Sequence, residues 1–357
     1  MRGGRALAFA VLCTVCAAGA AVYVRHAARR TAVPSADNAP PAEPPLGPAD
    51  GSSLAVGEPA GQGAPALLFR STGVDAAYGK LVLTPLDDVD ARRVVSTFSC
   101  ERVDYAGGRG VCLNADRGVA TRYSAIIFDR RFQPVATLAL GGVPSRVRVS
   151  PDGRLAAVTV FVSGHSYTGS FSTLTSVIDL ERGAYLIPDL EQLAVWDGDQ
   201  RLDAVDRNFW GVTFASDSDR FFATVSSGGR THLIQGALSD HTAHTLRGDV
   251  ECPSLSPDNT RVAFKRRVGE GIGPVRWRLS VLRLDTLEEV PLAEAHSIDD
   301  QAQWLDNDHV MYALPVQEGG SAETNTWVVD ADGRGEPRVL VGRAYSAVRV
   351  PPIRINP

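Results

Sequence analysis

The sequence predicts an all-β fold built as a six-bladed β-propeller, and three observations support this. From Leu67 onward the apolar runs are short and bounded by turn residues, with no convincing amphipathic helix. A strand–turn–strand unit recurs, as VRVSPDGRLAAV from Val147, VTFASDSDRFFAT from Val212, VECPSLSPDNTRVAF from Val250 and WLDNDHVMY from Trp304. Each unit holds about four strand signals in about 45 residues, which is the size of one propeller blade.

The individual strands are predicted from apolar and β-branched runs between turn residues. Pro257, Asp258 and Asn259 show the turn chemistry, because Pro fixes φ while Asp and Asn tolerate the bend. The expected strands are Leu67–Arg70, Lys80–Thr84, Val94–Thr97, Val111–Leu113, Ser124–Phe128, Val135–Leu140, Ala156–Val162, Thr175–Asp179, Phe221–Thr224, Thr231–Gln235, Val262–Lys265, Arg278–Leu284, Val310–Ala313 and Trp327–Val329.

Six such units fit into residues 67–357, which we expect to form the propeller. The first blade lacks an innermost strand, and the segment Ala344–Val350 has strand character without a partner of its own. We expect this last strand to complete the first blade, because closing the ring removes exposed sheet edges. The blades are expected to begin near Leu67, Cys100, Pro144, Phe209, Val250 and Asp299.

Residues 1–30 are predicted to be a membrane-targeting segment. An uncharged run from Ala6 to Val24 would span roughly 28 Å as a helix, enough for the hydrocarbon core. Two interpretations stay open: an uncleaved signal-anchor, or a signal peptide cleaved after the A-x-A sequence Ala18-Gly19-Ala20. Cys13 and Cys16 within the run are interpreted as small apolar residues.

Residues 31–66 are predicted to be a disordered linker that holds the propeller off the membrane. They are dense in Pro, Ala, Gly and Asp, and they lack the apolar surface needed to offset the entropy of ordering. The whole chain carries a formal net charge of -5, which argues against nonspecific nucleic-acid binding. Positive residues flank both ends of the apolar run, so flanking charge alone does not decide topology.

Two cysteines are expected to form a disulfide. A hairpin centred near Ala106 would place Cys100 opposite Cys112, and facing residues of an antiparallel pair approach bridging distance. The alternative is a pair of buried free thiols, as in a cytoplasmic domain. Cys252 is interpreted as a core residue, and no C-x2-C pair is accompanied by the second ligand pair that a zinc site needs.

No catalytic signature is found, so we expect a protein that is not an enzyme and has no cofactor. The segment Gly164–Gly169 (GHSYTG) misses the nucleophile-elbow pattern because Thr168 stands where Gly is required. His241 and His244 are interpreted as part of a polar outer-strand turn rather than a metal site. The acidic loop that contains Asp197, Asp199, Asp203 and Asp206 lacks the Gly and the terminal Glu of a calcium loop.

The best candidate binding site is the mouth of the central channel, which is ringed by the loops that enter the innermost strands. We expect a mostly acidic mouth that could hold a cation or a basic peptide, although the same residues could also be ordinary solvated loop positions. Its candidate residues are Glu101, Asp206, Arg207, Asn208, Glu251, Asp299 and Asp300. The neighbouring Phe209, Trp210 and Trp304 are expected to pack between blades.

The turn sequences Ser150–Gly153 (SPDG) and Ser256–Asn259 (SPDN), each followed by an apolar strand, resemble the repeat of TolB-like six-bladed propellers. The resemblance covers roughly Leu67 to Val350. Longer segments at 204–215, 250–267 and 297–308 resemble a set of actinobacterial membrane-anchored TolB-like proteins with no assigned activity. Periplasmic TolB has an additional N-terminal α/β domain where this chain has the linker, so the resemblance implies fold and location more than a role in the Tol system.

Three functions follow as expectations. The first is a non-catalytic, membrane-tethered scaffold whose propeller binds a protein or peptide partner in the cell envelope. The second is a cation-dependent propeller hydrolase or lyase that acts at the central channel, and the third is a glycan binder. We expect a single-pass protein of the cell membrane with an extracytoplasmic propeller, or, if the signal is cleaved, a secreted protein.

Overall fold

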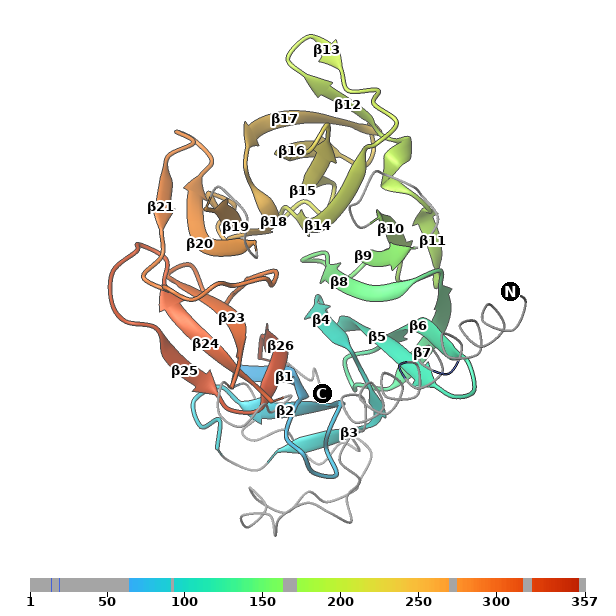
Figure 1. Cartoon of the computed structure of the whole chain (residues 1–357). Helices are drawn as coiled ribbons and strands as arrows, with labels where there is room; N and C mark the ends of the chain where they lie inside the picture. The colour runs from blue at the N-terminus through green and yellow to red at the C-terminus, as the bar shows by residue number, and fades with distance from the viewer. Residues whose placement is uncertain are drawn as a thin grey trace, which may run out of the picture. The chain divides into compact units, whose positions relative to one another are not determined.

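The computed structural model describes residues 64–90, 93–162, 172–269, 275–316 and 323–352, together with Thr14 and Gly19. These residues form six sheets arranged as blades around a ring (Figure 1), which confirms the predicted all-β, six-bladed propeller. Nearly all of the predicted membrane segment and of the linker lies outside the described residues. In the part of the chain that is described, no helix is long and apolar enough to cross a membrane.

Blades 1 to 3 have four strands each and begin close to the predicted positions. From the innermost strand outward, blade 1 consists of β26 (Ala344–Val350), β1 (Ala66–Ser71), β2 (Lys80–Pro85) and β3 (Val94–Ser99). Blade 2 consists of β4 (Arg102–Ala106), β5 (Arg109–Arg117), β6 (Thr121–Phe128) and β7 (Pro134–Leu140). Blade 3 consists of β8 (Val143–Val149), β9 (Leu155–Val162), β10 (Ser172–Asp179) and β11 (Ala184–Ile187).

Blade 4 is larger than blades 5 and 6, which again have four strands each. Blade 4 consists of β14 (Asn208–Phe214), β15 (Arg220–Ser227), β16 (Arg230–Ala237), β17 (Thr242–Gly248), β12 (Ala194–Asp197) and β13 (Gln200–Arg201). Blade 5 consists of β18 (Glu251–Leu255), β19 (Arg261–Val268), β20 (Arg276–Arg283) and β21 (Glu289–Pro291). Blade 6 consists of β22 (Gln303–Trp304), β23 (His309–Pro315), β24 (Thr324–Asp330) and β25 (Arg338–Val341).

The ring is closed by the C-terminal strand. β26 pairs antiparallel with β1, with Ala66 opposite Val350 and Ser71 opposite Ala344, and so becomes the innermost strand of blade 1. It also contacts blade 2, where Ser346 Oγ accepts a hydrogen bond from the Val103 N–H at 3.0 Å and donates one to the Val103 carbonyl at 2.9 Å. β26, for which the sequence showed no partner of its own, is therefore part of blade 1 and also contacts blade 2.

Blade 4 is widened by a hairpin that the sequence did not predict. The segment between blades 3 and 4 contains a short 3-10 helix, η2 (Leu190–Gln192), capped by the Asp189 side chain, followed by β12 and β13. β12 pairs parallel with β17, with Val195 opposite Ala243, and so extends blade 4 outward. The Val195 side chain is fully buried, which anchors this insertion to the blade.

The hydrophobic core is divided among the blade interfaces. Six clusters of buried apolar side chains are present, and each joins two neighbouring blades around the ring. Phe209 lies in the cluster between blades 3 and 4, and Trp304 lies in the cluster between blades 5 and 6. Both side chains and that of Trp210 are buried, as expected for residues that pack blade against blade.

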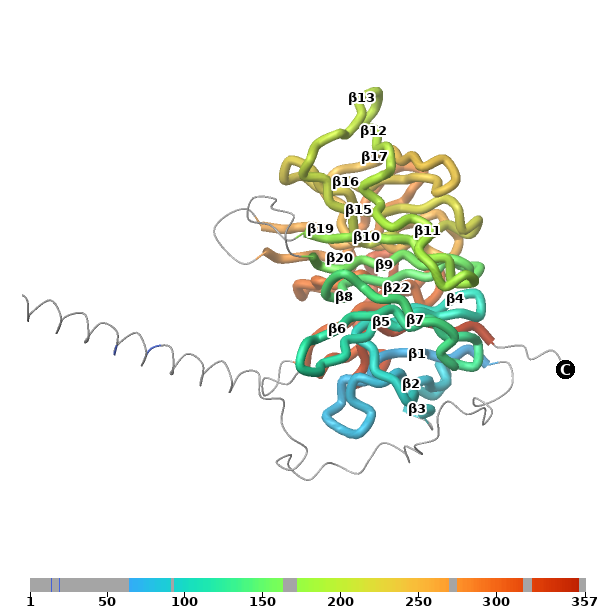
Figure 2. The backbone as a smooth tube through the Cα atoms, turned by 90° about the vertical axis from the view of Figure 1, so that its right-hand side faces the viewer, coloured from blue at the N-terminus to red at the C-terminus, as the bar shows by residue number. Residues whose placement is uncertain are grey.

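The innermost strands give the propeller two different faces. Loops that enter the innermost strands, and loops between the second and third strands, lie on one face, which we call the entry face. Tight turns between the innermost and second strands lie on the other, which we call the turn face. Figure 2 views the propeller from its side, with the strands running from one face to the other.

The turn face is built from repeats of one turn. In blade 3 the Ser150 hydroxyl donates to Asp152 at 2.6 Å and accepts the Leu155 N–H at 2.9 Å. In blade 5, Ser256 makes the same two bonds, to Asp258 at 2.5 Å and from Arg261 at 3.0 Å. These side chains satisfy the polar backbone of the turn, as the turn sequences predict.

Candidate functional site

The central charged cluster begins with Asp300, in the loop that enters β22. Its carboxylate accepts a hydrogen bond from Arg102 of β4 at 2.5 Å and from the Gln301 N–H at 2.9 Å. The Arg102 guanidinium also lies over the Tyr345 ring, 4.4 Å from its centroid. The contact between Arg102 and Asp300 connects blade 2 to blade 6 across the ring.

The neighbouring Asp299 is held by cations as well. Its carboxylate accepts a hydrogen bond from the Lys265 ammonium of β19, and Arg146 of β8 lies 3.9 Å away. Burial opposes ionisation of Asp299, but Lys265, Arg146 and Arg102 outweigh it and hold the pKa of this carboxyl below its usual value. The Lys265 ammonium also lies 4.1 Å from the centroid of the Trp277 ring.

Glu251 completes this group from the start of β18. Its carboxylate lies 4.0 Å from the Lys265 ammonium and is buried. Burial raises the pKa of Glu251 to about 7, with a further increase from Asp299, although Lys265 acts in the opposite direction. Glu251, Lys265 and Asp299 therefore form one coupled group.

A second, deeper group lies beside the first. Arg148 of β8 donates to the Ala302 carbonyl at 3.0 Å and to the Ser254 hydroxyl at 3.3 Å. Its guanidinium is 3.9 Å from Asp104 of β4, which also accepts hydrogen bonds from Gln303 at 2.7 Å and from the Val149 N–H at 2.6 Å. Complete burial raises the pKa of Asp104 despite these partners.

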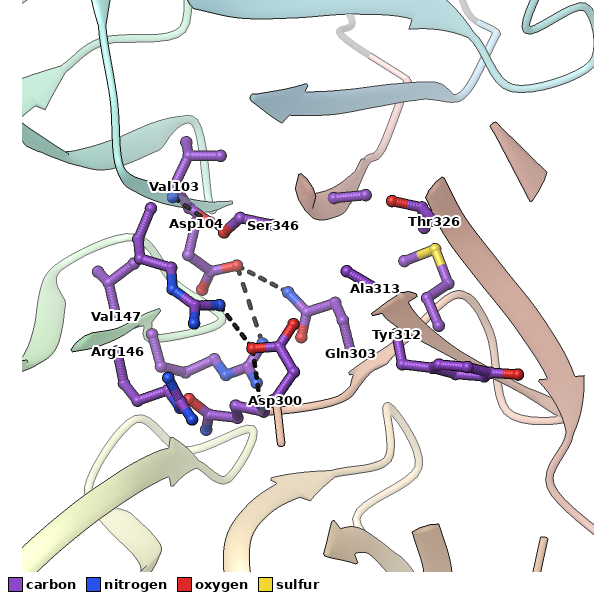
Figure 3. A pocket seen from close by; sticks show the side chains of 15 residues that line it. Val103, Asp104, Arg146, Val147, Asp300, Gln303, Tyr312, Ala313, Thr326 and Ser346 are labelled. Carbon is purple, nitrogen blue, oxygen red and sulfur yellow. Dashed lines mark hydrogen bonds and ion pairs between the residues drawn. The ribbon is translucent and has the colours of Figure 1, made fainter. Parts of the chain in front are cut away.

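These side chains line a cavity of about 40 Å³, which is room for one or two water molecules or one small ligand group. In Figure 3 the side chains of Asp104, Asp300 and Gln303 point toward one another at one end of it. The cavity is lined by residues of blades 1, 2, 3 and 6: Arg102, Val103, Asp104, Arg146, Val147, Arg148, Asp300, Gln301, Gln303, Met311, Tyr312, Ala313, Thr326, Ser346 and Ala347.

Four of the seven residues proposed from the sequence lie elsewhere. Glu101 forms an ion pair with Arg117 at 2.7 Å and lies 3.9 Å from Arg70, and these arginines are on β5 and β1, the second strands of blades 2 and 1. Asp206 accepts hydrogen bonds from the Ser227 hydroxyl and the Gly228 N–H.

The other two make contacts that order the chain around blade 4. Arg207 donates to the carbonyls of Glu191 and Leu193. Asn208 is buried and accepts hydrogen bonds from the Thr173 N–H and hydroxyl at 2.9 and 2.6 Å. The structure therefore brings together only Glu251, Asp299 and Asp300 of the predicted set.

The charge of the site also differs from the expected acidic mouth. Arg102, Arg146, Arg148 and Lys265 stand beside the carboxylates, and sequence reasoning missed them because it considered the loops and not the strands. One signal was available, since the innermost strand of blade 3 reads RVR at Arg146–Arg148. Two arginines at alternate positions of a strand share one face, which is unusual for a strand enclosed by other blades.

The disulfide between Cys100 and Cys112 is present, with the Cα atoms 5.4 Å apart and both residues buried. The expected strand register is wrong, however. The hairpin turns at Gly107 and Gly108, so Cys112 pairs with Val103. Cys100 lies just before β4, where its N–H donates to the Gly79 carbonyl, and reaches Cys112 from outside the ladder.

The remaining sequence motifs have structural positions where they are described. His241 lies in the turn before β17 and His244 on that strand, as interpreted from the sequence. Asp197 accepts the Thr245 hydroxyl and Asp203 pairs with Arg201, so these acids belong to the hairpin on blade 4. Cys252 is a buried free cysteine.

Two further motifs concern metal binding and nucleophilic catalysis. Among the described residues, no group of three or more His, Cys, Asp or Glu side chains could hold a metal ion. The segment 164–169 lies outside the described residues.

Exposed apolar side chains are unevenly distributed over the two faces. Of the twelve exposed large apolar residues in the described ranges, eight lie in entry-face loops or at the strand ends beside them, and the other four lie on outermost strands. The eight are Val74, Tyr78, Val119, Val143, Phe161, Val205, Val268 and Val275. The four are Val135, Tyr185, Leu186 and Val339.

No protein-family model matches the chain, and no curated protein matches it in sequence. Among solved structures, TolB from Acinetobacter baumannii is similar, with a TM-score of 0.54 and 14% identity over 81% of this chain and 67% of that one. A chain of a nidogen/laminin complex has a TM-score of 0.50 and 10% identity over 80% of this chain and 98% of that one.

A puromycin-hydrolysing peptidase from Mycobacterium tuberculosis is also similar, with a TM-score of 0.47 and 15% identity over 78% of this chain and 44% of that one. At these identities the comparisons show a TolB-like β-propeller fold, and they leave open whether the chain is an enzyme.

Proposed function

We propose that this chain is a non-catalytic scaffold, tethered to the membrane of the cell envelope, whose propeller binds a protein or peptide partner through its entry face. The observation that carries the proposal is the concentration of exposed apolar side chains on that face. These eight residues come from blades 1 to 5 and share that face, and exposed apolar surface on one face is typical of protein interaction sites.

The position of these side chains supports a binding role over a structural one. Val143 and Phe161 are directly opposite each other on β8 and β9, and both are exposed at the entry-face end of blade 3. Val268 and Val275 flank the corresponding loop of blade 5. Because Val143, Val268 and Val275 belong to none of the six core clusters, their apolar character is better explained by contact with a partner.

The charged cluster adds a polar feature to the same face. Asp299 is the most exposed member, with 67% of its side chain accessible, whereas Arg146 and Arg148 are only 12% and 10% accessible. The Asp299 carboxylate is therefore accessible at the surface, and the guanidinium groups of Arg146 and Arg148 are enclosed beneath it. Apolar residues around a polar centre could position a peptide or loop over the channel.

The proposed location rests on the sequence and on the disulfide. The uncharged run from Ala6 to Val24 is long enough to span a membrane, and the resemblance to actinobacterial membrane-anchored TolB-like proteins supports the same placement. A disulfide between Cys100 and Cys112 is typical of an oxidising compartment. These two features together favour an extracytoplasmic propeller on a membrane tether.

Site-specific photo-crosslinking tests the binding role. A photoreactive amino acid is placed at Val143, Val205 or Val268 on the entry face, and at Val135 or Val339 on outermost strands as matched exposed-valine controls. The proposal expects discrete crosslinked adducts from the entry-face positions and none from the controls. Equal yields from both sets, or no adduct from any entry-face position, would contradict it.

Thiol labelling tests the location. Intact cells expressing a variant that lacks Cys13 and Cys16 are treated with a membrane-impermeant maleimide, with and without a prior impermeant reductant, in urea at a concentration that unfolds the propeller and leaves the membrane intact. We expect Cys100 and Cys112 to be modified from outside the cell only after reduction. If these cysteines stay inaccessible from outside and are already reduced, the propeller faces the cytoplasm and the envelope placement fails.

A further inference from the structure

The enclosed arginines of the channel cluster have more hydrogen-bond donors than partners. Two guanidinium groups carry ten N–H bonds. Within the described residues, Arg146 and Arg148 make three hydrogen bonds to oxygen, to Ser145, Ser254 and Ala302, and the Cys252 side chain is a further partner of Arg146. The buried Nε atoms of both arginines have no partner. Because an unpaired buried donor is costly, this surplus requires an explanation.

The nearby carboxylates do not use these donors. Asp300 is bound by Arg102 and by the Gln301 N–H, and Asp104 is bound by Gln303 and by the Val149 N–H. The closest approach of Arg148 to Asp104 is 3.9 Å, which is an ion pair without a hydrogen bond.

The other acid near the surplus donors is equally distant. Arg146 lies 3.9 Å from Asp299, and that carboxylate already accepts a hydrogen bond from Lys265. All three carboxylates near the two arginines, those of Asp104, Asp299 and Asp300, therefore accept hydrogen bonds from other groups.

The formal charge of the cavity lining is positive. Arg102, Arg146 and Arg148 line it together with only two acids, Asp104 and Asp300. Burial raises the pKa of Asp104 and lowers that of Arg148, so it opposes the charge on both members of this pair. An enclosed site with excess guanidinium groups and free N–H donors favours an anion, and planar guanidinium groups match the two oxygens of a carboxylate.

We propose that the cavity beside Arg146 and Arg148 is a carboxylate-binding site. A single carboxylate fits the cavity of about 40 Å³ and would accept hydrogen bonds from the terminal guanidinium N–H groups of the two arginines, since the Nε atoms lie too deep to be reached. The carboxylate can belong to a small free molecule or to the partner of the proposed scaffold. Only the second source rests on the proposed function, since the site itself follows from the arginines and the cavity.

Thermal unfolding of the purified full-length chain, with sodium acetate as the probe, tests the site. At equal ionic strength, 100 mM acetate should raise the melting temperature by roughly 2–4 °C relative to sodium chloride, because a ligand that binds only the folded state stabilises it. Arg146→Gln and Arg148→Gln should each lose the acetate-specific shift. Arg276→Gln, which removes an exposed arginine at the same face, should keep it.

Three outcomes would overturn the proposal. The proposal is overturned if acetate has no effect on the wild-type chain, or if chloride stabilises it equally. It is also overturned if both channel variants respond like Arg276→Gln. Should Arg148→Gln fail to fold, the decision rests on Arg146→Gln, whose side chain is nearer the surface and whose acidic neighbour Asp299 keeps Lys265 as a partner.

A second arm identifies the source of the carboxylate. Photo-crosslinking from Val143 is repeated on isolated membranes with 100 mM acetate or chloride. Loss of the adduct in acetate alone assigns the carboxylate to the partner, and an unchanged adduct assigns it to a small free molecule. If no adduct forms at all, the proposed function fails, and the unfolding experiment still decides whether the site exists.

Discussion

The two faces of the propeller are built from the same six blades, yet they use polar side chains in different ways. On the turn face, side chains bind backbone groups of their own turn or of the next blade. The Asn259 side-chain oxygen of blade 5 accepts a hydrogen bond from the Ser216 N–H of blade 4 at 2.8 Å. The Asn307 side-chain oxygen of blade 6 accepts one from the Asp258 N–H of blade 5 at 3.1 Å. On the entry face, charged side chains from different blades pair with one another around a cavity, and apolar side chains remain exposed.

Polar side chains on the turn face therefore stabilise the ring, whereas side chains on the entry face are available to bind a partner. The hydrogen bonds between turns of neighbouring blades join groups that the ring places side by side. The cavity lining combines charges from separate blades, and charge burial of this kind gives little net stability. Substitutions on the turn face should therefore reduce stability, whereas those on the exposed part of the entry face should reduce binding.

The largest loss of stability is expected when Gly107 on the turn face is replaced by alanine. A Cβ atom at this residue would lie 2.2 Å from the backbone carbon of Asp152 in the next blade, and its φ is +57°. Overlap and backbone strain together should make Gly107→Ala less stable by about 3–5 kcal/mol. Gly108→Ala is the control, because its φ is also positive but its nearest neighbour is at 3.9 Å. Urea unfolding would count against the turn-face model if both variants lost equal stability.

The next effect concerns the disulfide, which lies toward the entry face. Replacing Cys100 and Cys112 by serine removes a crosslink across 12 residues and should lower the free energy of unfolding by about 3 kcal/mol. A reductant should destabilise the wild-type chain to a similar extent and leave the double variant unchanged. Sensitivity of the variant to reductant would indicate that another thiol is responsible.

An effect that reaches a similar size only at its maximum, and that depends on pH, is expected from Glu251. Its folded pKa of about 7 exceeds the unfolded value of 4.5, so the folded state retains a proton that the unfolded state releases. The resulting stabilisation is complete below pH 4.5 and is lost as the pH rises through 7, with a maximum of about 3 kcal/mol.

Asp299 acts in the opposite direction and in a different pH range. Its lowered pKa contributes stability that is lost only below its unfolded value of 3.8. Melting curves between pH 5 and 8 should therefore show this decrease in the wild-type chain and not in Glu251→Gln. The assignment fails if both chains follow the same curve.

The smallest effect is expected at the exposed valines of the entry face. Val268→Ser should change the free energy of unfolding by less than about 0.5 kcal/mol. Val262→Ser on the same strand is the control, since its fully buried side chain should cost about 2 kcal/mol or more. Similar losses for the two variants in urea unfolding would show that Val268 supports the fold, which would weaken its assignment to a binding surface.

The blades could be predicted because their signals are local. A turn such as Ser256–Asn259 satisfies its own backbone, and the apolar strand that follows it has the same form in each blade. The hairpin of β12 and β13 was missed because β12 pairs parallel with β17, a strand about 50 residues later in the chain. Nothing in the short sequence of β12 indicates that distant partner.

The binding cluster was predicted only in part, for a related reason. Asp299 and Asp300 stand out as adjacent acids in a loop, but their cations come from strands of other blades. Arg102 is about 200 residues away from Asp300 in sequence. The charge of the channel therefore depends on which strand positions face it, and this becomes visible only when the ring is assembled.

The position of β26 has a consequence for biosynthesis. Its partner β1 is made first, and β26 begins about 270 residues later. At translation rates of 5–20 residues per second, the inner edge of β1 stays unpaired for roughly 15–55 s. During that time the exposed edge can pair with other extended chains, so the nascent protein depends on protection that the finished ring does not need.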